Sequence, residues 1–328
     1  MNAEIDKVLA SEEAIFAQAV RAVVTADVPG LKELLDQRPD LVTNRARAAH
    51  RSTLLHYTAV NGIEDELQLS GESIYQLIQN CAPAERPPLQ ERAIEIAWVL
   101  LDAGAEVDAT CETYGGGHLQ TTLNLLVSSG HPAGAGVQPE LVRLLCKAGA
   151  NADGIANNRS PLGTALAFGY PAAAKALVEC GAKIDNIVYA AAVGDMDQVR
   201  SYFDSTGRLK KDIGKCDFDW FGVSENPQTA AEQALVFASL CGEVKVVALL
   251  LDNGVNINAE PPGSHMTATP LHTVAATGQE SVARLLTKRG ADPTIRDKQH
   301  NSTPLEWAEH CKQPKIFEIL QDYLARWN

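Results

Sequence analysis

TPLHTVAATGQESVARLLTKRGADPT, residues 269–294, contains two short apolar runs that each end at a glycine. Apolar residues recur at helical spacing up to Gly278, and a second run from Val282 ends at Gly290. The pattern predicts two short helices joined by a turn. Helices this short cannot bury their apolar faces against each other alone, so we expect neighbouring units of the same build.

The second half of this pattern recurs along the chain, in strings such as LLDAGAEVD and LLLDNGVNIN. Its glycine stands at Gly104, Gly149, Gly181, Gly254 and Gly290. The successive differences are 45, 32, 73 and 36 residues, so the longest gap is close to two periods. A degenerate copy, YFDSTGRL at 202–209, supplies a glycine within that gap.

The first half recurs as well, and its copies are TLLHYTAVNG (53–62), TLNLLVSSG (122–130), SPLGTALAFG (160–169), NIVYAAAVG (186–194), ALVFASLCG (234–242), TPLHTVAATG (269–278) and TPLEWAEHC (303–311). With a terminal unit around residues 17–40, the count is eight. Thr-Pro-Leu-His, a helix-ending glycine and Leu-Leu-x-x-Gly-Ala, in copies near 33 residues, resemble the ankyrin repeat over nearly the whole chain.

The resemblance implies an all-α ankyrin-repeat solenoid of about eight helix-turn-helix units, with insertions. A content of 45% hydrophobic but only 5% aromatic residues fits a core of small Ala, Leu and Val helices. We expect a single domain over residues 1–328, because a solenoid grows by stacking. Its N-terminal cap is expected at about 1–45 and its C-terminal cap at about 300–328.

Three stretches are too long for the repeat. Residues 62–92 separate the two helices of the second unit and contain a possible extra helix, SIYQLIQN. Residues 109–120 contain three successive glycines, which favour a turn between units. The finger-loop insertion at 204–228 replaces a short turn and carries the aromatic residues Phe218, Trp220 and Phe221. These aromatic side chains either pack back on the neighbouring unit or contact a partner.

The charge of the chain limits its partners. A net charge of −13, with no cluster of Lys and Arg, argues against nucleic acid and anionic membranes. The N-terminal stretch is acidic and does not resemble a secretory signal, and no apolar run is long enough to cross a membrane. Seven scattered cysteines indicate free thiols in a reducing compartment, so we expect a cytoplasmic monomer.

The sequence predicts no catalytic residues, metal or cofactor. Cys111, His118 and His131 lack the paired spacing of zinc ligands, and no nucleophile motif occurs. His310 and Cys311 are adjacent on one predicted helix and diverge around it, so we interpret them as a surface pair in the cap. The resemblance implies that His56 and His272 tie neighbouring units together by hydrogen bonds.

The leading interpretation is a non-catalytic scaffold that binds an unidentified protein partner through its concave groove and turn tips. The resemblance places the two residues before each first-helix glycine in that groove. Phe168, Val193 and Leu240 would then form an apolar stripe there, beside the insertion at 204–228.

Three alternatives remain at this stage. The insertion could fold over the stripe and bury it. The chain could be an enzyme or enzyme subunit with its site between the insertion and the concave face, where the insertion offers Cys216, Asp217 and Asp219 but no histidine. It could also be a purely structural spacer.

Overall fold

The computed structural model describes residues 2–60, 73–113, 118–155, 161–214, 223–262 and 268–327. Contacts between residues group the chain into two compact units. The first comprises residues 1–164 and 175–182, and the second comprises 165–174 and 183–328. The assignment of residues 1–328 to a single domain stays a prediction.

The described part of the first unit is built from helices of different lengths and a pair of four-residue strands. Its elements are α1 (Asn2–Thr25), α2 (Val28–Gln37), η1 (Pro39–Val42), η2 (Leu54–Thr58), α3 (Ile74–Asn80), η3 (Pro83–Glu85), α4 (Arg86–Asp102), β1 (Thr110–Thr113), β2 (His118–Thr121), α5 (Thr122–Ser128), α6 (Gly130–Gly134) and α7 (Gln138–Lys147). The boundary between the two units falls within the next pair, α8 (Pro161–Ala167) and α9 (Pro171–Glu179).

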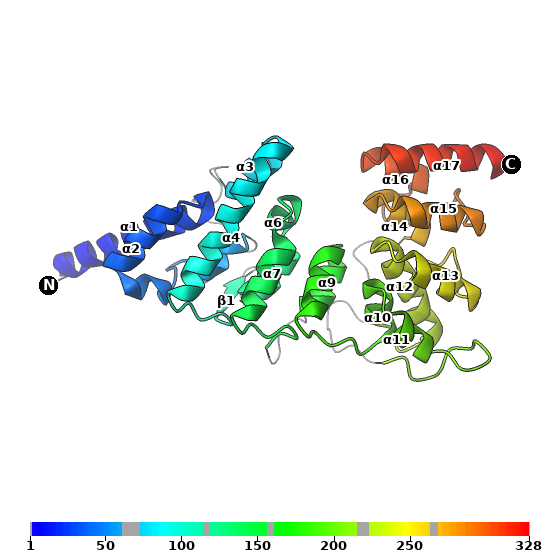
Figure 1. Ribbon diagram of the computed structural model, residues 1–328, viewed down its shortest axis with the longest axis horizontal. Helices are drawn as coiled ribbons and strands as arrows, with labels where there is room; N and C mark the ends of the chain where they lie inside the picture. Colours follow the sequence, from blue (N-terminus) through cyan, green and yellow to red (C-terminus); the bar gives the residue numbers. More distant parts are fainter. Residues whose placement is uncertain are drawn as a thin grey trace. The chain divides into compact units, whose positions relative to one another are not determined.

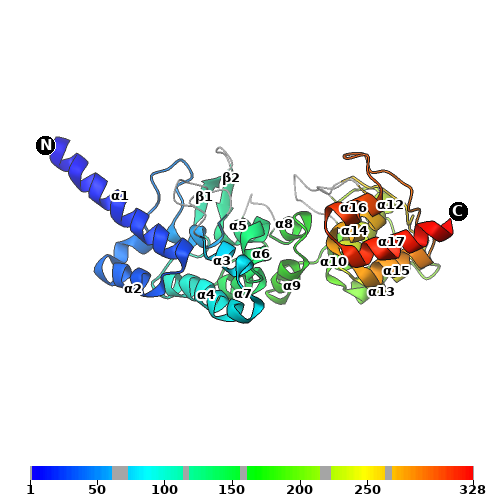
Figure 2. The same ribbon diagram turned by 90° about the horizontal axis from the view of Figure 1, so that it is seen from above.

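The second unit continues with helix pairs that stack in chain order (Figure 1). They are α10 (Ile187–Val193), α11 (Met196–Ser201), α12 (Pro227–Leu240), α13 (Val244–Asp252), α14 (Pro270–Thr277), α15 (Glu280–Lys288), α16 (Pro304–His310) and α17 (Pro314–Trp327). Seen from above, α12, α14 and α16 lie on one side of this stack and α13, α15 and α17 on the other (Figure 2).

Across the described residues, eight first helices alternate with eight second helices. The first helices are α1, η2, α5, α8, α10, α12, α14 and α16, and the second helices are α2, α4, α7, α9, α11, α13, α15 and α17. This arrangement confirms the predicted all-α ankyrin solenoid fold. None of the helices in the described part of the chain is long and apolar enough to cross a bilayer.

The Thr-Pro-Leu-His string starts a first helix for local reasons. The Thr269 side chain caps α14 by accepting a hydrogen bond from the His272 amide, and Pro270 fits the first turn because it needs no amide donor there. In α16, Thr303 and Glu306 form a reciprocal capping box. The helix starts are therefore encoded within four residues.

His56 and His272 tie neighbouring units together, as predicted. The Nε2 of His56 lies 3.0 Å from the carbonyl oxygen of Ala109, and that of His272 lies 3.0 Å from the carbonyl oxygen of Ser302. Because a carbonyl only accepts, Nε2 carries the proton, while the Nδ1 of His56 accepts a hydrogen bond from the Thr53 amide. Both imidazoles are fully buried.

Burial of these histidines makes stability depend on pH. Burial lowers the pKa of His56 to about 4 and also lowers the pKa of His272. As the pH falls below about 6.5, the two histidines therefore take up protons in the unfolded chain before they do so in the folded protein. We expect His56 alone to remove about 2 kcal/mol from the free energy of unfolding between pH 7 and pH 5.

Urea denaturation of the wild type and of His56→Gln at several pH values tests this expectation. Glutamine can keep a donor near the Ala109 carbonyl but does not titrate. The stability of the variant should therefore fall less steeply between pH 7 and pH 5. Parallel curves for the two proteins would show that His56 is not the group responsible.

The structure refines two of the predicted insertions. The extra helix in 62–92 is confirmed as α3, which Ser73 caps by accepting the Tyr75 amide. In the stretch 109–120, predicted as a turn, the described residues form the antiparallel strands β1 and β2, in which Thr110 pairs with Thr121. Four-residue strands leave too short an alternation to be recognised in a sequence. The three glycines lie outside the described residues.

The described part of the 204–228 insertion packs against its own unit. Phe203 pairs with Leu209, and Gly214 pairs with Asn186, the residue that caps α10. Ile213 is buried. Ile213 and Gly214 thus lie against the start of α10, and the insertion's aromatic residues fall outside the described range.

Candidate functional site

A pocket of about 500 Å³ opens between the first helices of the last two pairs. Ala276 at the end of α14 and the side chains of α16 form its walls, and the loop before α16 forms its rim. Its lining residues are Ala276, His300, Ser302, Glu306, Trp307, His310 and Cys311. A volume of this size has room for one or a few side chains of a bound peptide.

Asp297 anchors the loop before α16, which forms the rim of the pocket. Its side chain is fully buried and accepts hydrogen bonds from Trp307 Nε1 at 3.0 Å, the His300 amide at 2.7 Å and the Ser302 amide at 3.0 Å. Burial by itself raises the pKa of Asp297, but these donors outweigh it and hold the pKa well below its usual range. The carboxylate is therefore ionised and holds the rim of the pocket in place.

Trp307 forms an aromatic floor. Its side chain is almost fully buried, and the rings of His272 and His300 meet it edge to face at centroid distances of 5.4 and 5.8 Å. His310 lies exposed at the end of α16, and Cys311 is half-buried beside it. The pocket thus combines an apolar base with a polar rim.

The chemistry of the rim does not suit nucleophilic catalysis. Burial raises the pKa of the Cys311 thiol, so it stays protonated at neutral pH. Glu306 is held as a carboxylate by hydrogen bonds from Thr303, and it also faces Arg296 at 3.2 Å. Among the described residues, no three His, Cys, Asp or Glu side chains gather in a way that could hold a metal ion.

The predicted groove residues differ in accessibility. Phe168 is 36% exposed and stacks on Tyr170 with a ring separation of 6.4 Å. Val193 is half-buried, and Leu240 is only 5% exposed, so Leu240 adds almost nothing to an accessible surface. Their role in partner binding stays a prediction. The other predicted contacts, Phe218, Trp220 and Phe221, lie outside the described residues. So do Cys216, Asp217 and Asp219, the residues of the enzyme alternative.

The sequence interpretation missed the pocket around Trp307, although a signal was present. Aligned on the helix start, His310 and Cys311 take the places of Ala276 and Thr277, the groove positions of the preceding copy. Lys312 even adopts the left-handed backbone, with φ 55°, that the glycine takes in that copy. Extending the alignment by one unit would have placed His310 and Cys311 in the groove.

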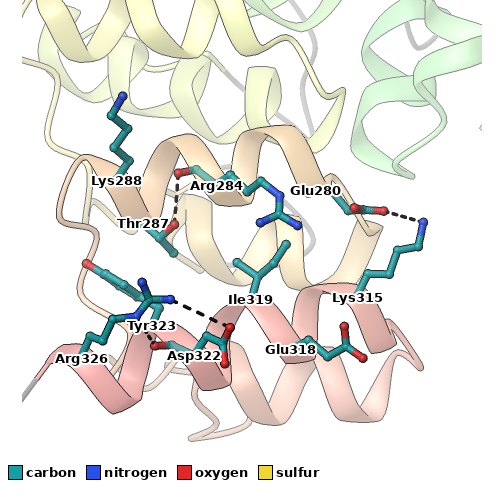
Figure 3. A pocket seen from close by; sticks show the side chains of 10 residues that line it. All are labelled: Glu280, Arg284, Thr287, Lys288, Lys315, Glu318, Ile319, Asp322, Tyr323 and Arg326. Atoms are coloured by element: carbon teal, nitrogen blue, oxygen red, sulfur yellow. Dashed lines mark hydrogen bonds and ion pairs between the residues drawn. The ribbon is translucent and has the colours of Figure 1, made fainter.

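A second hollow lies between the second helices α15 and α17 (Figure 3). It is strongly charged, and Glu280 pairs with Lys315 across it at 3.0 Å. Arg284 points into the hollow beside Ile319 (Figure 3). Its mixture of acidic and basic side chains favours no single charge in a ligand.

Comparison with known proteins agrees with the architecture. Residues 187–297 and 235–328 match the family model for ankyrin repeats in three copies. This match covers residues 187–328, so that part of the chain consists of ankyrin repeats. The helix pairs and the histidine tie of the first unit have the same architecture. Ankyrin repeats are generally protein–protein interaction modules.

Several relatives carry the same repeats. Ankyrin repeat and SOCS box protein 6 of Mus musculus is 34% identical over 97 residues, which cover 30% of this chain and 22% of that protein. The putative E3 ubiquitin-protein ligase XBAT35 of Arabidopsis thaliana is 35% identical over 111 residues, 33% of this chain and 22% of that protein. The chain therefore matches only about a fifth of the length of these relatives.

An ankyrin repeat-containing protein of Saccharomyces cerevisiae is 24% identical over 143 residues, covering 42% of this chain and 75% of that protein. Among solved structures, the human ASB11 ankyrin repeat domain aligns over 93% of this chain and 96% of its own, with 20% identity and a TM-score of 0.40.

Proposed function

We propose that the chain is a non-catalytic recognition scaffold whose partner protein lies across the first helices and turn tips of the second unit. The observation that carries this proposal is the pocket around Trp307, an apolar-floored hollow on the first-helix surface. Because buried Asp297 fixes its rim in advance, binding there costs little ordering entropy.

The proposed interface extends along the same unit to Phe168, whose partly exposed ring lies at a groove position. Val193 would contribute its accessible part, and Phe218, Trp220 and Phe221 would contribute from the insertion. The free thiols among the described cysteines and the acidic composition favour a cytoplasmic monomer. Light scattering on the purified protein tests whether it is a monomer.

The enzyme alternative has weaker support. The name of the Arabidopsis relative includes ubiquitin ligase, but the match covers 22% of that protein. The raised pKa of Cys311 also disfavours a thiolate in the pocket.

The test is to capture the partner from native lysate, identify it by mass spectrometry and measure its affinity for purified variants. Phe168→Ala and Trp220→Ala should each weaken binding roughly thirtyfold, as expected for interface hot spots. Cys311→Arg should block the pocket and weaken binding at least as much. Lys245→Ala, an exposed change on α13, is the matched control and should leave affinity unchanged.

Melting temperatures distinguish recognition from packing. If Phe168→Ala lowers the melting temperature by many degrees and binding follows the folded fraction, that side chain belongs to internal packing. Equal affinity for all four variants would place the partner elsewhere on the molecule.

A further inference from the structure

Helix α4 in the first unit carries apolar side chains together with a carboxylate on its outer face. Its inner face is buried through Ala93, Ile96, Ala97 and Leu100. On the outer face, Pro87, Glu91, Ile94 and Trp98 follow one another at helical spacing, and Trp98 is 51% exposed. A large aromatic ring on the solvent side of a second helix calls for an explanation.

The chain's own repeats show that this tryptophan is unusual. Trp98 stands six residues before the repeat glycine, Gly104. The same position in the copies that end at Gly149, Gly181, Gly254 and Gly290 is occupied by Arg143, Lys175, Ala248 and Arg284. Three of these four copies have a basic residue where α4 has tryptophan.

The basic residue at this position faces the next second helix. Arg143 on α7 donates to Glu179 on α9 at 2.7 Å. Arg284 on α15 points into the hollow where α17 presents Glu318 and Asp322 (Figure 3). The repeat thus places a cation between consecutive second helices, opposite carboxylates of the following unit.

Between α4 and α7 that cation is missing. The groove there, named here the Trp98 groove, is lined by Pro87, Gln90, Glu91, Ile94, Glu95, Trp98 and Glu140. It holds three carboxylates and no basic side chain. Glu95 is neutralised by Lys32 on α2 at 2.8 Å. Glu91 and Glu140 are exposed and form no ion pair with any described residue.

Two basic side chains near the Trp98 groove are already engaged. Arg143, one turn beyond Glu140 on α7, is bound to Glu179. Arg92 on α4 donates to the carbonyl oxygen of Ala26. The groove therefore combines an exposed indole with two carboxylates, Glu91 and Glu140, that form no ion pair with a described residue, although the charge of Arg143 also acts on Glu140.

We propose that the Trp98 groove docks a basic segment of a partner protein. A Lys or Arg side chain of that segment lies over the indole of Trp98, and its charge is balanced by Glu91 and Glu140. The partner thereby supplies the cation that the other repeats carry themselves. This surface belongs to the second helices of the first unit and is distinct from the pocket around Trp307.

The test uses a fluorescently labelled peptide of eight alternating Arg and Gly residues and the full-length protein. Trp98→Ala and Glu140→Gln should each weaken peptide binding about fivefold or more. Trp98→Arg restores the residue type of the other repeats and should weaken binding further, because the new guanidinium can pair with Glu140. Anisotropy at low salt measures the affinities.

The matched control is Glu318→Gln, which removes one negative charge from the equivalent groove between α15 and α17. It should change the affinity less than twofold. Trp98 is exposed, so all variants should keep the wild-type melting temperature. The proposal is overturned if Glu318→Gln costs as much as Glu140→Gln, which would indicate unspecific attraction to an acidic protein, or if Trp98→Ala binds the peptide as well as wild type.

Discussion

Gly214→Ala is expected to lower the free energy of unfolding by about 4 kcal/mol. Gly214 has a φ of +79°, which costs an alanine about 1–2 kcal/mol. An added Cβ would also overlap the carbonyl oxygen of Asp185, part of the backbone that leads into α10. Backbone cannot move aside as a flexible side chain can. The substitution should therefore disrupt either the bridge between residue 214 and Asn186 or the cap that Asn186 forms on α10.

Gly254→Ala provides the matched control, because Gly254 has nearly the same φ, +80°, and no heavy atom lies within 4 Å of an added Cβ. It should cost only about 1 kcal/mol. Urea denaturation followed by far-UV circular dichroism measures both variants. Equal losses for the two would mean that Gly214 does not pack against the start of α10 as the structure describes.

Asp297→Ala is expected to cost about 4 kcal/mol, since the substitution leaves the donors of Trp307, His300 and Ser302 buried without an acceptor. The loop that supplies the Ser302 carbonyl to His272 would also lose its anchor. The last helix pair should therefore unfold first, and the pocket around Trp307 should be lost with it. Hydrogen exchange over residues 298–310 would show this as reduced protection.

Asp292→Ala is the comparison for Asp297→Ala. Asp292 accepts hydrogen bonds from the Thr294 amide and hydroxyl in the preceding turn, but it is only half-buried. Water can replace its bonds, so we expect a loss of about 1 kcal/mol. A similar loss in both variants would contradict the assignment of Asp297 as the anchor of the loop.

Much of the fold could be predicted because its signals are local. Thr269 caps a helix through an amide three residues away, and each repeat glycine ends a helix within its own turn. Such interactions depend on a few neighbouring residues, so they are visible as strings in the sequence. The repeat then requires like units to stack, which also places His56 and His272 between units.

The accessibility of the candidate sites could not be predicted in the same way. Phe168 and Cys241 occupy equivalent groove positions directly before the helix-ending glycine, yet Phe168 is exposed and Cys241 is buried. The pocket around Trp307 also depends on a buried carboxylate, Asp297, whose role in the loop no local string reveals. Sequence motifs identify the position of a residue in the repeat, but they do not show which other side chains cover it.

The sequence by itself determined the repeat, its helix starts and ends, its all-α class and the structural role of two histidines. Only the tertiary structure decided that Leu240 is covered, that residues 110–113 pair as a strand with residues 118–121 and that Trp98 lies open on α4. The reason is physical: caps and turns are set by hydrogen bonds within one turn of chain, whereas exposure is set by side chains from neighbouring units.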